Sequence, residues 1–228
     1  MDFVTGTPAV GQPLSRTEDP RLLRGEGRYT NDINLPNQAH AYILRSAHAH
    51  GIIRNIERDA ALAMPGVLAI YTGADLQAAG YGTLPCNVAL KSHDGTPLLA
   101  PENPALAIDR VRYRGHPVAA VIAETIAQAK DAAEAVMLEI DELPAVDTVE
   151  AAALAGAPQV WPEIEGNQCL DYLAGDPVAV EAAFAKAAHI SRISFFNNRL
   201  VIAPLEPRAA VAAYSAPEGN GEIGRAHV

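Results

Sequence analysis

Cysteine and aromatic residues are both scarce in this chain of 228 residues. The two cysteines, Cys86 and Cys169, are too few for a disulfide framework or a cysteine-bound metal cluster, so we expect two ordinary thiols in a reducing compartment. The aromatic residues are one Trp, seven Tyr and four Phe. The core is therefore expected to consist of Leu, Ile and Val, with close packing around the many alanines.

Long apolar runs and an excess of basic residues are also missing. No stretch of 18 apolar residues occurs, so no membrane-spanning helix is predicted. Residues 1–16 have neither a basic start nor an apolar run, so no secretory signal is predicted and a cytoplasmic location is expected. The net charge of −10 argues against a nucleic-acid partner. Most of the acidic excess lies in residues 94–150, which we interpret as a solvated face, with a docking surface as the alternative.

The local patterns mix strands and helices and predict an α+β fold. Three prolines in the first 20 residues favour an extended arm there. Apolar or alternating segments predict strands at residues 39–46, 51–57, 67–72, 106–113, 117–123, 136–142, 189–197 and 208–214. Caps and breakers predict helices at residues 59–63, 73–79, 126–136, 148–154 and 177–187, with Thr125, Asp147 and Asp176 as N-caps. The Pro- and Gly-rich residues 80–104 predict a long irregular loop.

Four histidine and acidic positions are candidates for chemistry. His48 and His50 would lie on one face of a strand and could offer two imidazoles to a metal, but no third ligand can be named; the alternative is a surface or hydrogen-bonding role. His93 and Asp94, in the long loop, could form an acid/base pair or be an ordinary loop pair.

Two glycine-containing turns complete the set of candidates. Gly25 and Gly27 lack the third glycine and the preceding strand of a nucleotide-binding loop, so a tight turn with exposed arginines is predicted. In Arg114-Gly115-His116 we expect the glycine to form a turn and the histidine to orient it. No complete active-site motif occurs. We therefore predict no catalytic, cofactor-binding or metal-binding residue in this chain.

Ordered stretches of sequence point to a family. They are residues 16–33, 41–50, 64–76 and 111–147. In order and spacing they resemble the start of the large subunit of the molybdenum hydroxylases, the family of xanthine dehydrogenase, aldehyde oxidase and carbon monoxide dehydrogenase. Pro204 to Arg208 is similar to the opening of that family's molybdopterin-binding domain, although Leu205 stands where Met is common. His116 stands where many members have Gln.

The resemblance implies a domain organisation. Residues 1–18 would be an extended arm, residues 19–145 an a/b hammerhead domain, and residues 146–221 a linker with the truncated start of the molybdopterin-binding domain. Residues 222–228 match the translation of a common sequencing adapter and are expected to be foreign to the protein. We therefore expect the strand at 208–214 to have an unpaired edge and residues 190–228 to pack less well than residues 1–145.

The resemblance also implies a function. The complete subunit would hold a molybdenum–molybdopterin cofactor, hydroxylate an aldehyde, carbon monoxide or an N-heterocycle with water, and pass electrons onward. The implied partners are an iron–sulfur small subunit and an FAD-binding medium subunit, in a dimer of heterotrimers. The arm begins the chain, with no fused iron–sulfur or flavin segment before it, so separate subunits are expected. A carbon monoxide dehydrogenase-like or aldehyde-oxidising member is therefore favoured over a purine hydroxylase. The catalytic residues would lie beyond residue 228, so this chain alone is expected to be inactive. The alternatives are a non-catalytic assembly module and an unrelated α+β binding protein.

Overall fold

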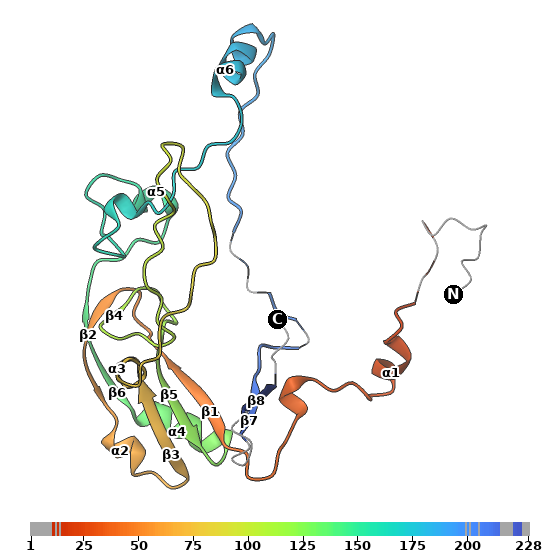
Figure 1. Ribbon diagram of the computed structural model, residues 1–228, viewed down its shortest axis with the longest axis vertical. Coiled ribbons are helices and arrows are strands. Elements are labelled where there is room, and N and C mark those ends of the chain that lie inside the picture. The colour runs from red at the N-terminus through yellow and green to blue at the C-terminus, as the bar shows by residue number, and fades with distance from the viewer. Residues whose placement is uncertain are drawn as a thin grey trace. The chain divides into compact units, whose positions relative to one another are not determined.

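The computed structural model describes residues 11, 13, 15–198, 200, 202–204, 206–214 and 221–224 (Figure 1). The chain divides into two compact units. The larger unit is Asn37–Ile193, and the smaller one combines Met1–Pro36 with Ser194–Val228. Each unit is described by itself below.

The first sheet of the larger unit has β5 (Pro117–Ala123) at its centre, between β1 (His40–Arg45) and β3 (Val67–Thr72). Both neighbours run antiparallel to β5. The central strand is the continuous apolar run of the sequence, because it has a partner on each side and buries most of its side chains. Helix α4 (Ile126–Ala135) buries three alanines against this sheet, and their small side chains allow a close approach.

The second sheet has the order β4-β2-β6, with all neighbours antiparallel. Its strands are β2 (Gly51–Glu57), β4 (Arg110–Val111) and β6 (Met137–Glu142). A small cluster of Ala107, Val111 and Val118 lies at its core. Ile56 packs against this cluster and also against the core of the first sheet, so it links the two sheets.

Short helices connect these strands and follow them. They are α2 (Asp59–Leu62), α3 (Gly73–Ala78), α5 (Val149–Ala152), the 3-10 turn η2 (Glu165–Asn167) and α6 (Pro177–Lys186). Thr125 and Asp176 cap α4 and α6 as predicted, each accepting a hydrogen bond from a backbone N–H three residues on. The N-cap of α5 is Thr148, so the prediction of Asp147 was wrong by one residue. None of the described helices is long and apolar enough to cross a bilayer.

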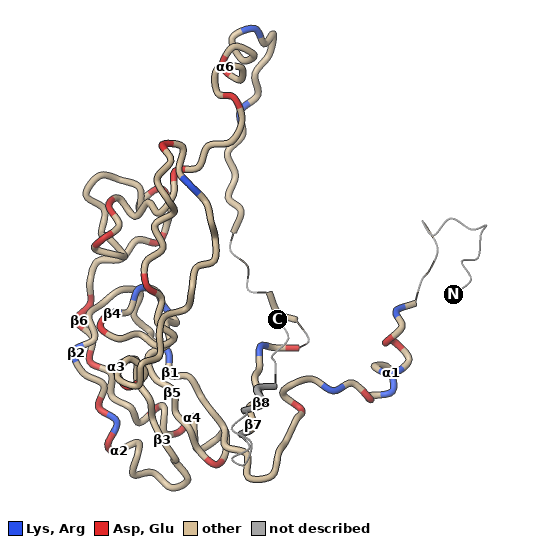
Figure 2. Tube along the Cα trace, in the orientation of Figure 1, with Lys and Arg blue, Asp and Glu red and all other residues tan. Residues whose placement is uncertain are grey.

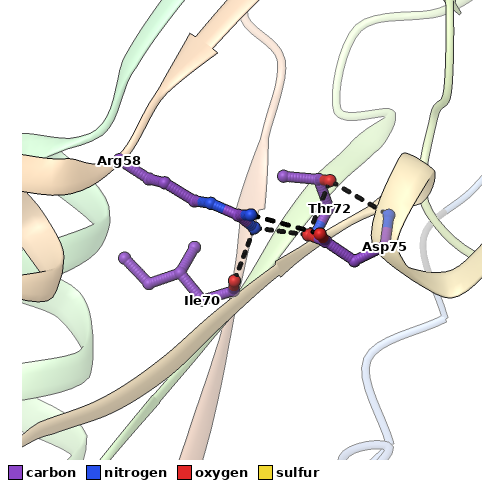
Figure 3. A network of polar contacts seen from close by, with 4 residues as sticks. All are labelled: Arg58, Ile70, Thr72 and Asp75. Carbon is purple, nitrogen blue, oxygen red and sulfur yellow. Dashed lines mark hydrogen bonds and ion pairs between the residues drawn. The ribbon is translucent and has the colours of Figure 1, made fainter. Parts of the chain in front are cut away.

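A polar network ties α3 to the strand before it (Figure 3). The Asp75 carboxylate accepts hydrogen bonds from the Thr72 N–H and hydroxyl at 2.7 and 2.8 Å. Arg58 makes a two-point ion pair with the same carboxylate and donates to the Ile70 carbonyl at 2.8 Å. These bonds hold the pKa of Asp75 well below its usual range, and the bond from Arg58 has the largest effect. The pair therefore joins α2, β3 and α3 into one corner of the fold.

The smaller unit contains α1 (Asp19–Leu23), the 3-10 turn η1 (Thr30–Asp32) and a hairpin of β7 (Val211–Tyr214) with β8 (Gly221–Gly224). Val211 lies opposite Gly224 in antiparallel register. The strand expected at 208–214 is therefore shorter, since it begins at Val211. Its partner is β8, and most of β8 lies in residues 222–228, the expected foreign tail. Residues 225–228 lie outside the described part of the chain.

Three further predictions of local structure were wrong. The arm does not stay extended to residue 20, because α1 begins at Asp19; Pro20 lies in the first helical turn, where a missing N–H costs nothing. Residues 1–10, 12 and 14 lie outside the described part. Of the strand predicted at 106–113 only Arg110–Val111 forms. No strand forms at 189–197, where the apolar side chains are exposed and lack the second strand that a ladder requires.

Candidate functional site

His48 and His50, which were weighed as metal ligands, do not lie on a strand. The chain bends after Arg45, and the Ser46 hydroxyl accepts a hydrogen bond from the His48 N–H at 3.0 Å. His48 Nδ1 lies 2.7 Å from Glu142 Oε1. His50 is buried, and its Nδ1 donates to the Pro144 carbonyl at 2.8 Å. The hydrogen-bonding alternative therefore describes both residues.

His93 and Asp94 do not pair with each other. Asp94 accepts hydrogen bonds from the Thr96 hydroxyl and N–H at 2.6 and 2.9 Å, which lower the pKa of the Asp94 carboxyl. His93 Nδ1 instead lies 3.2 Å from Asp171 Oδ2. The histidine and both carboxylates are on the surface, so this loop shows the local bonding of a turn rather than an acid/base pair.

The turn before β5 is built as predicted. Gly115 has φ +88°, a conformation that favours glycine. His116 is buried, stacks on Tyr113 at 4.4 Å between ring centroids, and accepts a hydrogen bond from the Arg112 N–H at 3.2 Å. Burial and the nearby Arg112 charge lower the pKa of His116. The histidine thus holds the turn in shape.

Arginines gather beside this turn, at β4 in Figure 2. Arg112 lies over the Trp161 ring, 3.8 Å from the ring centroid, so the segment after the sheet is anchored on the turn. Arg110 Nη1 lies 3.4 Å from His50 Nε2, and Arg45 donates to the Gly115 carbonyl at 2.9 Å. The sequence signal for this cluster was three arginines within five residues of an otherwise acidic stretch, which our sequence reasoning did not use.

No metal centre is formed by the described residues: nowhere in them do three or more His, Cys, Asp or Glu side chains meet in a way that could hold an ion. Cys86 is exposed and Cys169 partly buried, and both are free thiols. In Gly25-x-Gly27 the first glycine has φ +72°, consistent with the predicted turn, and Arg21 and Arg24 beside it are exposed.

Two of the motif segments meet in the smaller unit, which the sequence alone could not show. Glu206 Oε1 accepts hydrogen bonds from the Thr30 N–H and hydroxyl, both at 3.1 Å. Thr30 belongs to the first family-like stretch and Glu206 to the Pro204–Arg208 segment, 176 residues later. The contact gives Glu206 a structural role, because it joins the 3-10 turn at Thr30 to the Pro204–Arg208 segment.

The paired antiparallel sheets with α4 on one of them define the class of this domain, which is the a/b hammerhead. The family model described as "Aldehyde oxidase and xanthine dehydrogenase, a/b hammerhead domain" matches residues 24–144. The chain therefore belongs to the aldehyde oxidase and xanthine dehydrogenase family of molybdenum hydroxylases. This confirms the family and the fold class inferred from the sequence.

Individual relatives agree with this assignment. The chain is 37% identical to the nicotine 6-hydroxylase large subunit of Paenarthrobacter nicotinovorans, over 90% of this chain and 24% of the relative. Quinoline 2-oxidoreductase of Pseudomonas putida 86 superimposes with a TM-score of 0.74 and 34% identity, over 92% of this chain and 26% of its own. The Cu,Mo-CO dehydrogenase superimposes with a TM-score of 0.62 and 29% identity, over 78% of this chain and 23% of its own. The chain thus spans about a quarter of the length of these relatives.

Proposed function

We propose that this chain is the hammerhead-containing part of the molybdenum-cofactor subunit of a hydroxylase. The observation that carries the proposal is the similarity to the nicotine 6-hydroxylase large subunit over nine-tenths of this chain. The reaction would be hydroxylation of an N-heterocycle, an aldehyde or carbon monoxide, with water as the source of oxygen. Two of the three relatives above are named for N-heterocycles, so that substrate class is the first to test.

The proposal places the metal outside this chain, in keeping with the sequence-based expectation that the cofactor-binding loops lie further along the subunit. When bound elsewhere in the complete subunit, a molybdenum–molybdopterin group would supply the two-electron oxidation. We assign no catalytic, cofactor-binding or metal-binding role to any residue of this chain. Its contribution would be a rigid neighbouring domain, built around the two sheets and the Arg112–Trp161 contact.

The remaining parts of the proposal concern assembly. Electrons would leave through iron–sulfur and FAD groups on two partner subunits, in a cytoplasmic dimer of heterotrimers. Residues 146–221 would lead into the molybdopterin-binding domain. The exposed apolar side chains of Phe184, Phe195 and Phe196 support this, since side chains of that size are normally buried.

The experiment uses the complete subunit, purified with its partners from cells that carry its gene. A panel of N-heterocycles, aldehydes and carbon monoxide is offered together with an artificial electron acceptor, in isotopically labelled water. We expect turnover of one class, with labelled oxygen in the product. The matched control is enzyme from cells grown without molybdate, which should be inactive. Label drawn from dioxygen, or equal activity without molybdenum, would overturn the proposal.

The same assay on the 228-residue chain separates its role from that of the whole subunit. Since no reacting group is assigned to it, we expect no turnover of any substrate. Measurable hydroxylation by the purified chain would contradict the assignment of a purely structural part.

A further inference from the structure

A small cavity beside the turn at Gly115 has a positively charged lining. Its volume is about 150 Å³, enough for about five water molecules at about 30 Å³ each. Arg112 and Arg114 are its charged lining residues, and no Asp or Glu lines it. Most of the remaining wall is apolar and comes from Pro144–Val146, Pro158 and Val160. Positive charge at a partly apolar cavity favours an anionic occupant, because attraction between charges is stronger where water is displaced.

The two arginine charges are poorly compensated. The Arg112 side chain is 11% exposed, and its ion pair with Asp109 is long, at 3.8 Å. Its Nε is buried without a hydrogen-bond partner among the described residues. Burial also lowers the pKa of this guanidinium. Arg114 has no hydrogen bond or ion pair to any other residue that the structure describes.

Besides the arginines, the polar side chains in the lining are His50 and Tyr113. The His50 ring already has partners on both nitrogens. Its Nδ1 donates to the Pro144 carbonyl at 2.8 Å, and its Nε2 lies 3.4 Å from Arg110 Nη1. His50 therefore fixes the cavity wall, and the two arginines are the charged groups of the lining that can bind an anion.

We propose that this cavity binds a small oxyanion, that is, a phosphate, sulfate or carboxylate group, through Arg114 and Arg112. A planar guanidinium offers paired N–H donors that match two oxygens of such a group, and these charge-assisted bonds are among the strongest polar contacts in proteins. Arg114 is exposed and free to close on the ligand, whereas Arg112 is held in place by Trp161. The proposal rests on the lining of this cavity and does not depend on the proposed function.

The test is a titration of the 228-residue chain with inorganic phosphate at constant ionic strength. Binding is measured by calorimetry and by the fluorescence of Trp161, the chain's single tryptophan. We expect saturable binding and a rise in Tm that chloride does not give. In R114Q the dissociation constant should rise by about tenfold or more, as expected for losing a hydrogen bond between charged groups. The matched control K130Q removes the same charge from an exposed position on α4 and should bind as the original chain does.

A second pair of variants tests the cavity rather than the charge alone. Ala145 lines the cavity and is exposed, so A145E places a carboxylate at the rim and should compete with phosphate, while A145Q should not. Equal phosphate affinity in the original chain, R114Q and A145E would overturn the proposal. So would a rise in Tm that depends on ionic strength alone.

Two sources of the oxyanion are separated by a parallel titration with acetate. Tighter binding of phosphate would assign the cavity to a free or phosphorylated small ligand. Tighter binding of acetate would assign it to an acidic side chain supplied by another polypeptide. Saturable binding of neither ion would contradict the proposal in both forms.

Discussion

The ion pair between Arg58 and Asp75 is the polar contact on which the larger unit should depend most. The substitution D75N keeps the shape of the side chain and one acceptor oxygen, but removes the negative charge. An asparagine side chain at this position would no longer match the two-point contact of Arg58, and the bonds to Thr72 that cap α3 would weaken. The corner where α2, β3 and α3 meet should therefore loosen.

The size of the effect follows from the contacts that are lost. Removing a hydrogen bond to a charged group costs about 1.5–3 kcal/mol. The two side chains are 31% and 32% exposed, so screening by water places the cost toward the lower end, at about 2 kcal/mol. For a domain of this size that corresponds to a Tm lower by about 4–8 °C.

The effect of D75N should depend on pH. The pKa of Asp75 is lowered in the folded chain, so the unfolded chain binds the proton at a higher pH than the folded one does. The stabilisation is complete above the ordinary carboxyl pKa of about 3.9 and is lost as the pH falls below it. The difference between the original chain and D75N should therefore be largest near neutral pH and shrink in acid.

Urea unfolding, followed by circular dichroism and by Trp161 fluorescence, measures this difference across pH. The matched control D131N removes the same charge from an exposed position on α4. A D75N chain as stable as D131N at neutral pH would refute the reasoning, as would a destabilisation that stays constant down to about pH 3.

Three further outcomes are expected. Because the pKa of His116 is lowered, the chain should lose stability as the pH falls below about 6.5, and H116L should lose less stability over the same range. The measurement is the urea midpoint of both chains at several pH values. If the midpoint falls with pH equally steeply in the original chain and in H116L, the prediction is wrong. G73A drives a Cβ into the Ala107 carbonyl and should cost about 1–3 kcal/mol in thermal melts, whereas the open position in G82A should cost under about 0.5 kcal/mol. E206Q should speed hydrogen exchange at the Thr30 amide, and unchanged exchange would mean that the contact is not stabilising.

Strong local signals made much of the fold predictable. The continuous apolar run Pro117–Ala123 became the central strand, and Thr125 and Asp176 became helix caps, because these features are decided within a few residues of the chain. The prediction at 106–113 failed because only Arg110–Val111 finds a partner strand, in β2. Pairing of that kind depends on residues far along the chain, and a local pattern does not contain it.

The candidate site could be predicted less well than the fold. His48 and His50 looked like one face of a strand, but the bend at Ser46 gave each its own hydrogen-bond partner. The contact of Arg112 with Trp161 joins residues that are distant in sequence and carry no motif. The family was nevertheless accessible from the sequence, since it rests on the order of whole stretches rather than on any single contact.

The central claim is that this chain is part of a molybdenum hydroxylase subunit, and metal content tests it most directly. The complete subunit, tagged in cells that carry its gene, would be purified with its partners and analysed for molybdenum by mass spectrometry. The account predicts molybdenum in stoichiometric amount, together with iron and FAD on copurified subunits. An intact, folded complex that contains no molybdenum, from cells supplied with molybdate, would contradict it.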